Sequence, residues 1–237
     1  MVLWIGVDDT DSLRGMCTTF LATEIVRDLT QDFDLIGYPR LVRLNPNIPW
    51  KTRGNGAICL RVGHGRGLAT TVGEIGGRKI RSYPRGSKEV EASEVVGRIA
   101  NLVERWSCFD DPTTNPAFVV LRRPPAAPLY WHAVRRVVTV AEARRAIHGL
   151  GMVRSYKEGR GIIGAAAATA WPMNARRLRP PAGPHGPPQL QRGKNRRCGS
   201  IMDVSPACAW MFCLERLAPT LKHFAPTASP GFTGIEG

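Results

Sequence analysis

A short apolar segment that runs straight into a cluster of carboxylates constrains this chain more than any other feature. Residues 1–7 are apolar and few, which is typical of a buried strand. Asp8, Asp9 and Asp11 then fall within four residues, and so much negative charge in one turn repels itself unless a cation is bound. Carboxylate oxygens suit Mg²⁺, which usually takes one or two carboxylates together with phosphate oxygens, so we expect two of the three to contact one ion. The alternative is a solvated acidic loop with an Asx-turn.

A helix is predicted shortly after this acidic run. Leu21, Ile25 and Leu29 share one face at helical spacing. Thr18 and Thr19 stand at its expected start, where a threonine is a good N-cap. A helix N-terminus also carries free amides and the positive end of the helix dipole, so it attracts phosphate. The residues alone leave two interpretations of Thr18, a plain N-cap and part of a metal–phosphate site.

The second motif is a basic, glycine-containing loop. Lys51, Arg53, Gly54 and Asn55 lie in the run KTRGNG, which combines two cations, a hydroxyl group and two glycines in six residues. Glycines let a backbone approach an anion closely, and lysine and arginine neutralise it. We interpret these residues as phosphate contacts. The alternative is an ordinary basic loop with turn glycines.

A third motif has the form Gly159-x-Gly161-x-x-Gly164. As a string it matches the dinucleotide fingerprint, but no strongly apolar strand precedes it and no acidic residue follows about 20 positions later, so we exclude a nicotinamide or flavin site. The start of the helix expected after it could still hold phosphate through Arg160 and Gly161. The glycines could equally allow close helix packing, and both interpretations stay open.

These motifs together resemble the archaeal agmatinylcytidine synthetase family, which attaches agmatine to a cytidine in the anticodon of a minor isoleucine tRNA. The resemblance covers roughly residues 1–172. It rests on four segments: GVDDTDS at 6–12, RGMCTT at 14–19, the long run at 36–57 that includes NPNIPWKTRGNGA, and KEGRGIIGA at 157–165.

The resemblance implies an ATP-dependent ligase that forms a C–N bond on tRNA. It implies ATP and Mg²⁺ as cofactors, agmatine and the minor isoleucine tRNA as partners, and a threonine that becomes phosphorylated, which matches Thr18. On this basis Asp8, Asp9 and Asp11 are assigned to the metal and, with Thr18, to catalysis. The residues assigned to nucleotide and phosphate contacts are Lys51, Arg53, Gly54, Asn55, Arg160 and Gly161.

Two other classes of function remain open on the sequence. A Mg²⁺-dependent phosphohydrolase acting on a small substrate would need the acidic loop but not the excess of basic residues. An inactive RNA-binding remnant would keep the basic surface without turnover. ATP consumption with and without tRNA separates all three.

Composition limits the partners and the cellular location that we expect for this protein. The 237 residues carry a formal net charge of +14, which favours a polyanionic partner. The six cysteines contain no Cys-x-x-Cys pair, which argues against a zinc ribbon and gives no disulfide framework. No signal peptide or membrane-spanning run is recognisable, so we expect a soluble, cytoplasmic protein.

Periodicity predicts an α+β fold with ferredoxin-like β-α-β-β-α-β elements in two small α/β domains. We expect a kinase-like catalytic domain at 1–122, part of a second, ferredoxin-like α/β domain at 123–173, and an Arg- and Pro-rich tail at 174–237. The tail composition is typical of disorder or of a non-native reading frame, and the OB-fold and zinc ribbon that the family brings to tRNA are not recognisable in it. The predicted strands are 2–7, 35–44, 57–62 and 117–121, the predicted helices are 19–29, 89–106, 130–149 and 165–171, and 63–87 is predicted as a loop.

Overall fold

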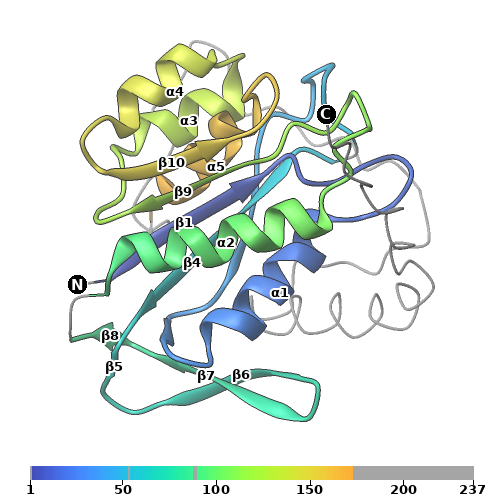
Figure 1. Cartoon of the computed structure of the whole chain (residues 1–237). Helices are drawn as coiled ribbons and strands as arrows, with labels where there is room; N and C mark the ends of the chain where they lie inside the picture. Colours follow the sequence, from blue (N-terminus) through green and yellow to red (C-terminus); the bar gives the residue numbers. More distant parts are fainter. Residues whose placement is uncertain (1, 53, 88–89, 173–237) are drawn as a thin grey trace, which may run out of the picture.

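The computed structural model describes residues 2–52, 54–87 and 90–172 (Figure 1). Arg53 and the predicted tail at 174–237 lie outside the described residues. The elements in chain order are β1 (Leu3–Asp8), α1 (Thr18–Leu29), β2 (Asp34–Ile36), β3 (Arg40–Arg43), β4 (Gly56–Gly63), β5 (Gly65–Arg66), β6 (Thr70–Ile75), β7 (Arg78–Tyr83), β8 (Arg85–Gly86), α2 (Ala92–Trp106), β9 (Ala117–Leu121), α3 (Pro128–Arg135), α4 (Val140–Ile147), β10 (Gly151–Ser155) and α5 (Gly161–Thr169).

One mixed sheet organises the described chain. Its strands follow the order β10-β9-β1-β4-β2-β7-β6, and β3 also pairs with β4. The central strand β1 is antiparallel to both of its neighbours, β9 and β4, and β2 is antiparallel to β4. A separate two-stranded sheet joins β5 to β8. The predicted mixed α+β class is confirmed, and similar solved structures share it.

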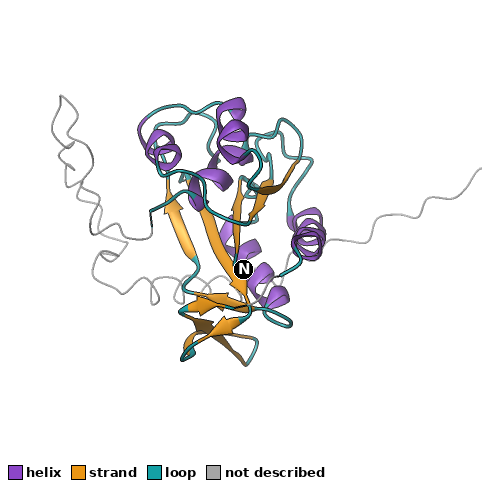
Figure 2. Cartoon of the chain, turned by 90° about the vertical axis from the view of Figure 1, so that its left-hand side faces the viewer, coloured by secondary structure: helices purple, strands orange, loops and turns teal. Residues whose placement is uncertain are grey.

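Helices cover both faces of the sheet (Figures 1 and 2). Leu3, Ile5 and Val7 of β1 point to the face that α1 and α2 cover, where they form one apolar cluster. The opposite face of the same strand packs against α5, with α3 and α4 outside it, and forms a second cluster. Because successive side chains of a strand alternate between the two faces, the next position after Val7, Asp8, projects toward α5.

α5 lies unusually close to β1 because both elements use glycine at the contact. A Cβ atom on Gly6 would lie 2.0 Å from the carbonyl oxygen of Ala165. A Cβ atom on Gly164 would overlap the carboxylate of Asp8 at 1.7 Å. α5 is apolar on every side and buried, as a helix between a sheet and two outer helices must be. The glycines of two motifs therefore set the distance between this helix and the strand that carries the acidic loop.

The prediction of a loop at 63–87 is wrong, because this segment forms β5, β6, β7 and β8. β6 and β7 form a hairpin closed by Gly76 and Gly77, both with positive φ (59° and 80°), which is the backbone that a tight two-residue hairpin turn requires. Ile80 is buried in the core on the α1 and α2 side. The segment is rich in glycine and arginine and has few apolar positions, so its sequence did not show the alternation that would predict a hairpin.

Two predicted elements are each divided in the structure. The predicted strand at 35–44 is β2 followed by β3, because Gly37 adopts a positive φ of 70° between them. The predicted helix at 130–149 is α3 followed by α4, and Thr139 begins α4 with a capping box that it shares with Glu142. The strand β10 was not predicted.

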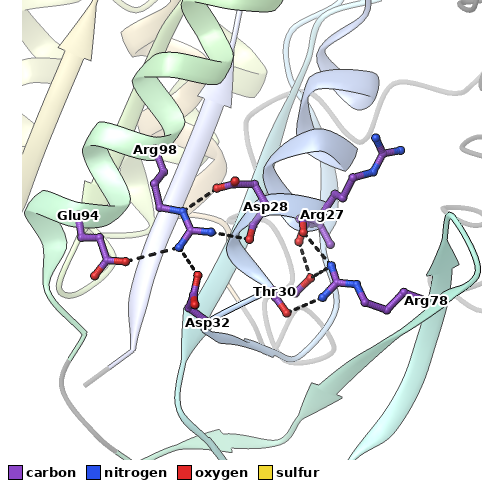
Figure 3. Close-up of polar contacts among 8 residues, drawn as sticks. Arg27, Asp28, Thr30, Asp32, Arg78, Glu94 and Arg98 are labelled. Atoms are coloured by element: carbon purple, nitrogen blue, oxygen red, sulfur yellow. Dashed lines mark hydrogen bonds and ion pairs between the residues drawn. The ribbon is translucent and has the colours of Figure 1, made fainter.

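A network of arginines ties the end of α1 to its neighbours (Figure 3). Arg98 of α2 donates to the carboxylate of Asp28 at 2.7 Å and to that of Asp32 at 2.6 Å. Arg78 of β7 donates to the carbonyl oxygens of Arg27 and Thr30, each at 2.7 Å. The two Arg78 contacts satisfy carbonyl groups that a helix C-terminus leaves without partners. They fix α1 from its far end, while its first residues face the site.

Candidate active site

A cavity of about 320 Å³ lies where β1 ends, between the start of α1, the loop at 44–56 and the first turn of α5. It brings together most of the residues that the sequence assigned to function, although they come from segments far apart in the chain. Arg53 lies outside the described residues, and Gly161 does not line the cavity. The predicted residues that do line it are Asp8, Asp9, Asp11, Thr18, Lys51, Gly54, Asn55 and Arg160.

The acidic loop places desolvated, like-charged carboxylates at one end of the cavity. Burial, with the nearby charge of Asp9, raises the pKa of Asp8 well above its ordinary value. Burial also raises the pKa of Asp9, to about 7, while the positive charge of Arg160 opposes this shift and the negative charge of Asp11 adds to it. Asp9 has a positive φ of 55°, which is uncommon outside glycine and places the turn directly at the end of β1.

These carboxylates fit a cation that is shared with a ligand better than one enclosed by protein alone. Within residues 2–52, 54–87 and 90–172, no three His, Cys, Asp or Glu side chains are arranged to hold a metal ion. The donors at this end of the cavity are carboxylate oxygens, and their mutual repulsion falls when a cation binds. Mg²⁺ characteristically uses one or two carboxylates and completes its shell with water and phosphate oxygens. The donor set therefore fits Mg²⁺ bound together with a phosphate ligand.

Thr18 is the first residue of α1, and the N-cap position belongs to Cys17, whose side chain makes no capping hydrogen bond. The interpretation of Thr18 as a plain N-cap is therefore wrong. Its hydroxyl oxygen accepts a hydrogen bond from the Thr10 hydroxyl at 3.1 Å, and the two residues are 6% and 1% exposed. Thr18 thus holds an oriented hydroxyl at the cavity wall, beside the positive end of a helix dipole.

The basic loop also lines the cavity and is held by hydrogen bonds to backbone groups. Leu44 donates its amide to the carbonyl of Asn55 at 3.0 Å, and the Asn55 side chain donates to the carbonyl of Asn45 at 2.8 Å. Asn45 in turn donates its amide to Ala133 of α3 at 3.0 Å. The side chain of Asn55 therefore fixes the shape of the loop. Lys51 is exposed, and its ammonium group lies 3.3 Å from the carbonyl oxygen of Ile48. A phosphate oxygen, which carries negative charge, is a stronger acceptor and can replace this neutral carbonyl.

Residues near the third motif divide into one that faces the cavity and one that does not. Arg160 lines the cavity, and its charge lowers the pKa of Asp9. A Cβ atom on Gly161 would lie 2.6 Å from the carbonyl oxygen of Asn115, so glycine is needed there for close packing. Of the two interpretations of the motif, close packing describes Gly161 and an electrostatic role describes Arg160.

The structure adds cavity residues that the sequence did not single out. Arg43 and Arg136 provide further positive charge, and Arg136 forms an ion pair with Glu142 at 2.9 Å. No local pattern marks Arg136, because α3 joins the cavity only through the tertiary fold. An apolar wall completes the site, with Trp50 half exposed at the cavity. Its apolar residues are Leu41, Leu44, Ile48, Trp50, Ala133, Val137, Val138 and Ile163.

Fold and cavity define an α+β protein in which carboxylates, a helix N-terminus, cations and an apolar wall meet at one cavity, the arrangement expected of a ligand-binding or active site. Residues 4–158, more than half of the chain, match the TiaS TCKD domain. The chain belongs to this family.

Curated relatives agree with the family match. The chain is 44% identical over 171 residues to the isoleucine-tRNA 2-agmatinylcytidine synthetase TiaS of Thermoplasma volcanium, covering 72% of this chain and 38% of the relative. It is 38% identical over 168 residues to the protein of the same name from Methanocorpusculum labreanum, covering 70% and 34%. The chain thus spans little more than a third of the length of these relatives.

Solved structures show the same similarity. A tRNA fluorescent labelling enzyme matches with a TM-score of 0.59 at 33% identity, covering 73% of this chain and 37% of the other. TiaS in complex with its isoleucine tRNA and ATP matches with a TM-score of 0.58 at 31% identity and the same coverage. Among the described helices, none has both the length and the apolar character needed to cross a membrane.

Proposed function

We propose that this chain carries the ATP-using catalytic part of a cytoplasmic isoleucine-tRNA agmatinylcytidine synthetase. The reaction attaches agmatine to C2 of the anticodon cytidine in the minor isoleucine tRNA. Relatives with this name match the chain over about 70% of its length, and one similar solved structure is described as a complex of TiaS with that tRNA, AMPCPP and agmatine. A formal charge of +14 suits a tRNA partner.

The observation that carries the proposal is the convergence of two sequence motifs on one cavity. The acidic loop and Thr18 line this cavity, and so do Lys51, Gly54 and Asn55. An isolated acidic loop or an isolated basic loop would each have an ordinary structural explanation. A cavity bounded by both suits a nucleoside triphosphate with its cation, because the carboxylates hold the metal and the cations neutralise phosphate oxygens.

The chemistry assigned to the site is phosphoryl transfer followed by displacement. ATP converts the C2 oxygen of the cytidine into a phosphate ester. The primary amine of agmatine then attacks C2, and the phosphate leaves with the C2 oxygen. Mg²⁺, when bound, offsets the charge that develops on the transferred group. Lys51 and Arg160 are positioned to add positive charge at the cavity, and Asp8, Asp9 and Asp11 to hold the cation.

Thr18 is proposed as the residue that takes up phosphate during the reaction. Its hydroxyl is buried beside the acidic loop, and its donor partner Thr10 fixes the orientation of its oxygen lone pairs. Positioning of the reacting groups is the main contribution that a protein makes to phosphoryl transfer.

The finer description of the fold is also a proposal. We assign residues 1–122 to the catalytic domain, with the second domain beginning at 123, and we propose a ferredoxin-like core for the first. The consecutive order β9-β1-β4-β2, with every adjacent pair antiparallel, supports this core. The packing of α1 against α2 supports it as well.

The proposal is tested by incubating the chain with γ-labelled ATP, Mg²⁺, labelled agmatine and a transcript of the minor isoleucine tRNA. We expect label from ATP on Thr18 and label from agmatine in the transcript. The double variant Asp9→Asn with Asp11→Asn should abolish both while remaining folded, since it removes the repulsion between two like-charged carboxylates, one of them desolvated. ATP consumption that depends neither on tRNA nor on Thr18 would point to a phosphohydrolase. RNA binding without any ATP consumption would point to an inactive remnant.

A further inference from the structure

The loop at 110–116 joins α2 to β9 and lies outside every motif that the sequence singled out. Its sequence is DDPTTNP. Three of its polar residues are buried, since Asp111 is 5% exposed and Thr114 and Asn115 are fully buried. None of them lines the cavity. Polar groups are buried at a cost unless they are hydrogen-bonded, so their partners reveal what the loop does.

One set of partners lies in the acidic loop. The Ser12 hydroxyl donates a hydrogen bond to the Asp111 carboxylate. The Thr114 hydroxyl donates to the carbonyl oxygen of Asp11 at 2.8 Å. The backbone amide of Asn115 donates to the carboxylate of Asp9, and this bond lowers the pKa of Asp9 against the effect of burial. The loop thus contacts the acidic loop at three points, two of them on the aspartates assigned to the cation.

A second set of partners lies at the start of α5. The ammonium group of Lys157 donates to the carbonyl oxygen of Asp111 at 2.5 Å. The amide of Gly161 donates to the carbonyl of Asn115 at 3.2 Å, and a guanidinium nitrogen of Arg160 lies 3.4 Å from the carbonyl of Thr113. One short loop therefore connects the carboxylates of the cavity to the residue that provides positive charge beside them.

Asp111 is the centre of these contacts. One of its carboxylate oxygens accepts from the Thr113 amide at 2.9 Å and from the Thr113 hydroxyl at 2.7 Å, while the other accepts from Ser12. The hydrogen bonds from Ser12 and Thr113 hold the pKa of this carboxyl well below its ordinary value. The side chain thus stays an acceptor at neutral pH, as the Ser12 contact requires.

We propose that the loop at 110–116 holds the acidic loop and the start of α5 in fixed register, with Asp111 as the positioning residue of the site. This inference rests on the proposed function, because it assigns Asp111 a role in preparing the cavity for the cation and ATP. Asp8, Asp9 and Asp11 repel one another before a cation binds, so a free acidic loop would spread apart. Asp111 opposes that spreading through its hydrogen bond from Ser12, and its own side chain does not line the cavity. A preformed site avoids the cost of ordering these residues when ATP arrives.

The test compares Asp111→Asn with Asp110→Asn. Asparagine keeps one oxygen for Thr113 but replaces the acceptor of the Ser12 hydroxyl with an amide that donates. The control residue Asp110 is in the same loop and pairs with Arg14 of the acidic loop at 2.9 Å, but both side chains are largely exposed (76% and 57%). We expect Asp111→Asn to slow phosphorylation of Thr18 at saturating ATP at least tenfold and to raise the half-saturating Mg²⁺ concentration. Asp110→Asn should stay within twofold of wild type in both.

The variant Ser12→Ala removes the same contact from the other side, together with the hydrogen bond that the Ser12 hydroxyl accepts from the Arg14 amide at 3.0 Å. We expect it to raise the half-saturating Mg²⁺ concentration as Asp111→Asn does, and the double variant to be no worse than Ser12→Ala alone, because the Ser12–Asp111 contact is lost in all three. A general loss of stability would instead lower activity without changing the dependence on Mg²⁺.

Hydrogen exchange provides a readout that does not depend on activity. In wild type the amides of Ser12 and Gly15 each donate to the other residue's carbonyl, at 3.1 and 3.3 Å. Asp111→Asn should speed exchange of the peptide covering 9–15, while α1 and α2 keep their protection and Asp110→Asn changes nothing. Equal exchange and equal kinetics in the two variants would overturn the inference. If wild type fails to phosphorylate Thr18, the proposed function fails, and the exchange comparison still decides whether the loop holds the site.

Discussion

Gly6→Ala should destabilise the protein more than any typical surface change, because it forces α5 away from β1. The added Cβ would lie 2.0 Å from the carbonyl oxygen of Ala165 and 2.8 Å from its carbonyl carbon, where ordinary contact begins at 3.4 Å. Both atoms are backbone, so no side-chain rotation relieves the overlap. Overpacking of this kind costs about 1–3 kcal/mol. The lower entropy of the unfolded alanine chain returns about 0.4–1 kcal/mol. The two effects together give a net loss of about 0–2.6 kcal/mol, and the overlap with two backbone atoms places Gly6→Ala toward the upper end of that range.

Gly97→Ala is the matched control for this prediction. Gly97 lies on the exposed side of α2, and a Cβ atom there would meet no atom within 4 Å. Alanine in an exposed helix interior should therefore raise the free energy of unfolding by about 0.5–1 kcal/mol. Urea denaturation followed by circular dichroism measures both variants, with an unchanged slope as the sign that only stability has changed. Equal stability of Gly6→Ala and Gly97→Ala would contradict the close packing of α5 against β1 at Gly6.

Three further outcomes are expected. Arg98→Lys should lower the free energy of unfolding in urea by about 1 kcal/mol, because an ammonium group cannot reproduce the forked contacts to Asp28 and Asp32. Thr18→Ala should abolish phosphate labelling by γ-labelled ATP, Thr18→Ser should retain it, and label at other residues in both variants would remove Thr18 from the reaction. Cys59 should resist iodoacetamide at pH 8 until the protein unfolds, because burial raises the pKa of its thiol to about 11. Peptide mapping by mass spectrometry follows that modification.

Local motifs allowed much of the site to be predicted. The acidic loop, Thr18 and the loop with Lys51 each combine unusual residue types within a few positions, and the structure places all of them at one cavity. Their shared location could not follow from spacing alone. The predicted helix at 19–29 begins one residue earlier, at Thr18, and the interpretation of Thr18 as its N-cap was wrong because Cys17 occupies that position.

The remaining parts depend on contacts between distant segments. Ser12 and Asp111 are 99 residues apart in the chain, so no local pattern indicates that they meet. β10 is a strand because it pairs with β9, although its sequence GMVRS has little strand character. The hairpin at β6 and β7 did have a local signal, the pair Gly76 and Gly77, which the overall glycine content obscured.

The most direct test of the account is whether the cavity binds the nucleotide. Binding of the ATP analogue AMPCPP can be measured by calorimetry in wild type, in Lys51→Ala and in Lys79→Ala, with and without Mg²⁺. Lys51 lines the cavity, whereas Lys79 is an exposed residue of β7 outside it. Loss of a charge-assisted contact to phosphate costs about 1.5–3 kcal/mol. We therefore expect Mg²⁺-dependent binding that weakens about tenfold or more in Lys51→Ala and is unchanged in Lys79→Ala. Equal affinity of the two variants for AMPCPP, or AMPCPP binding that does not depend on Mg²⁺, would contradict the assignment of this cavity to ATP.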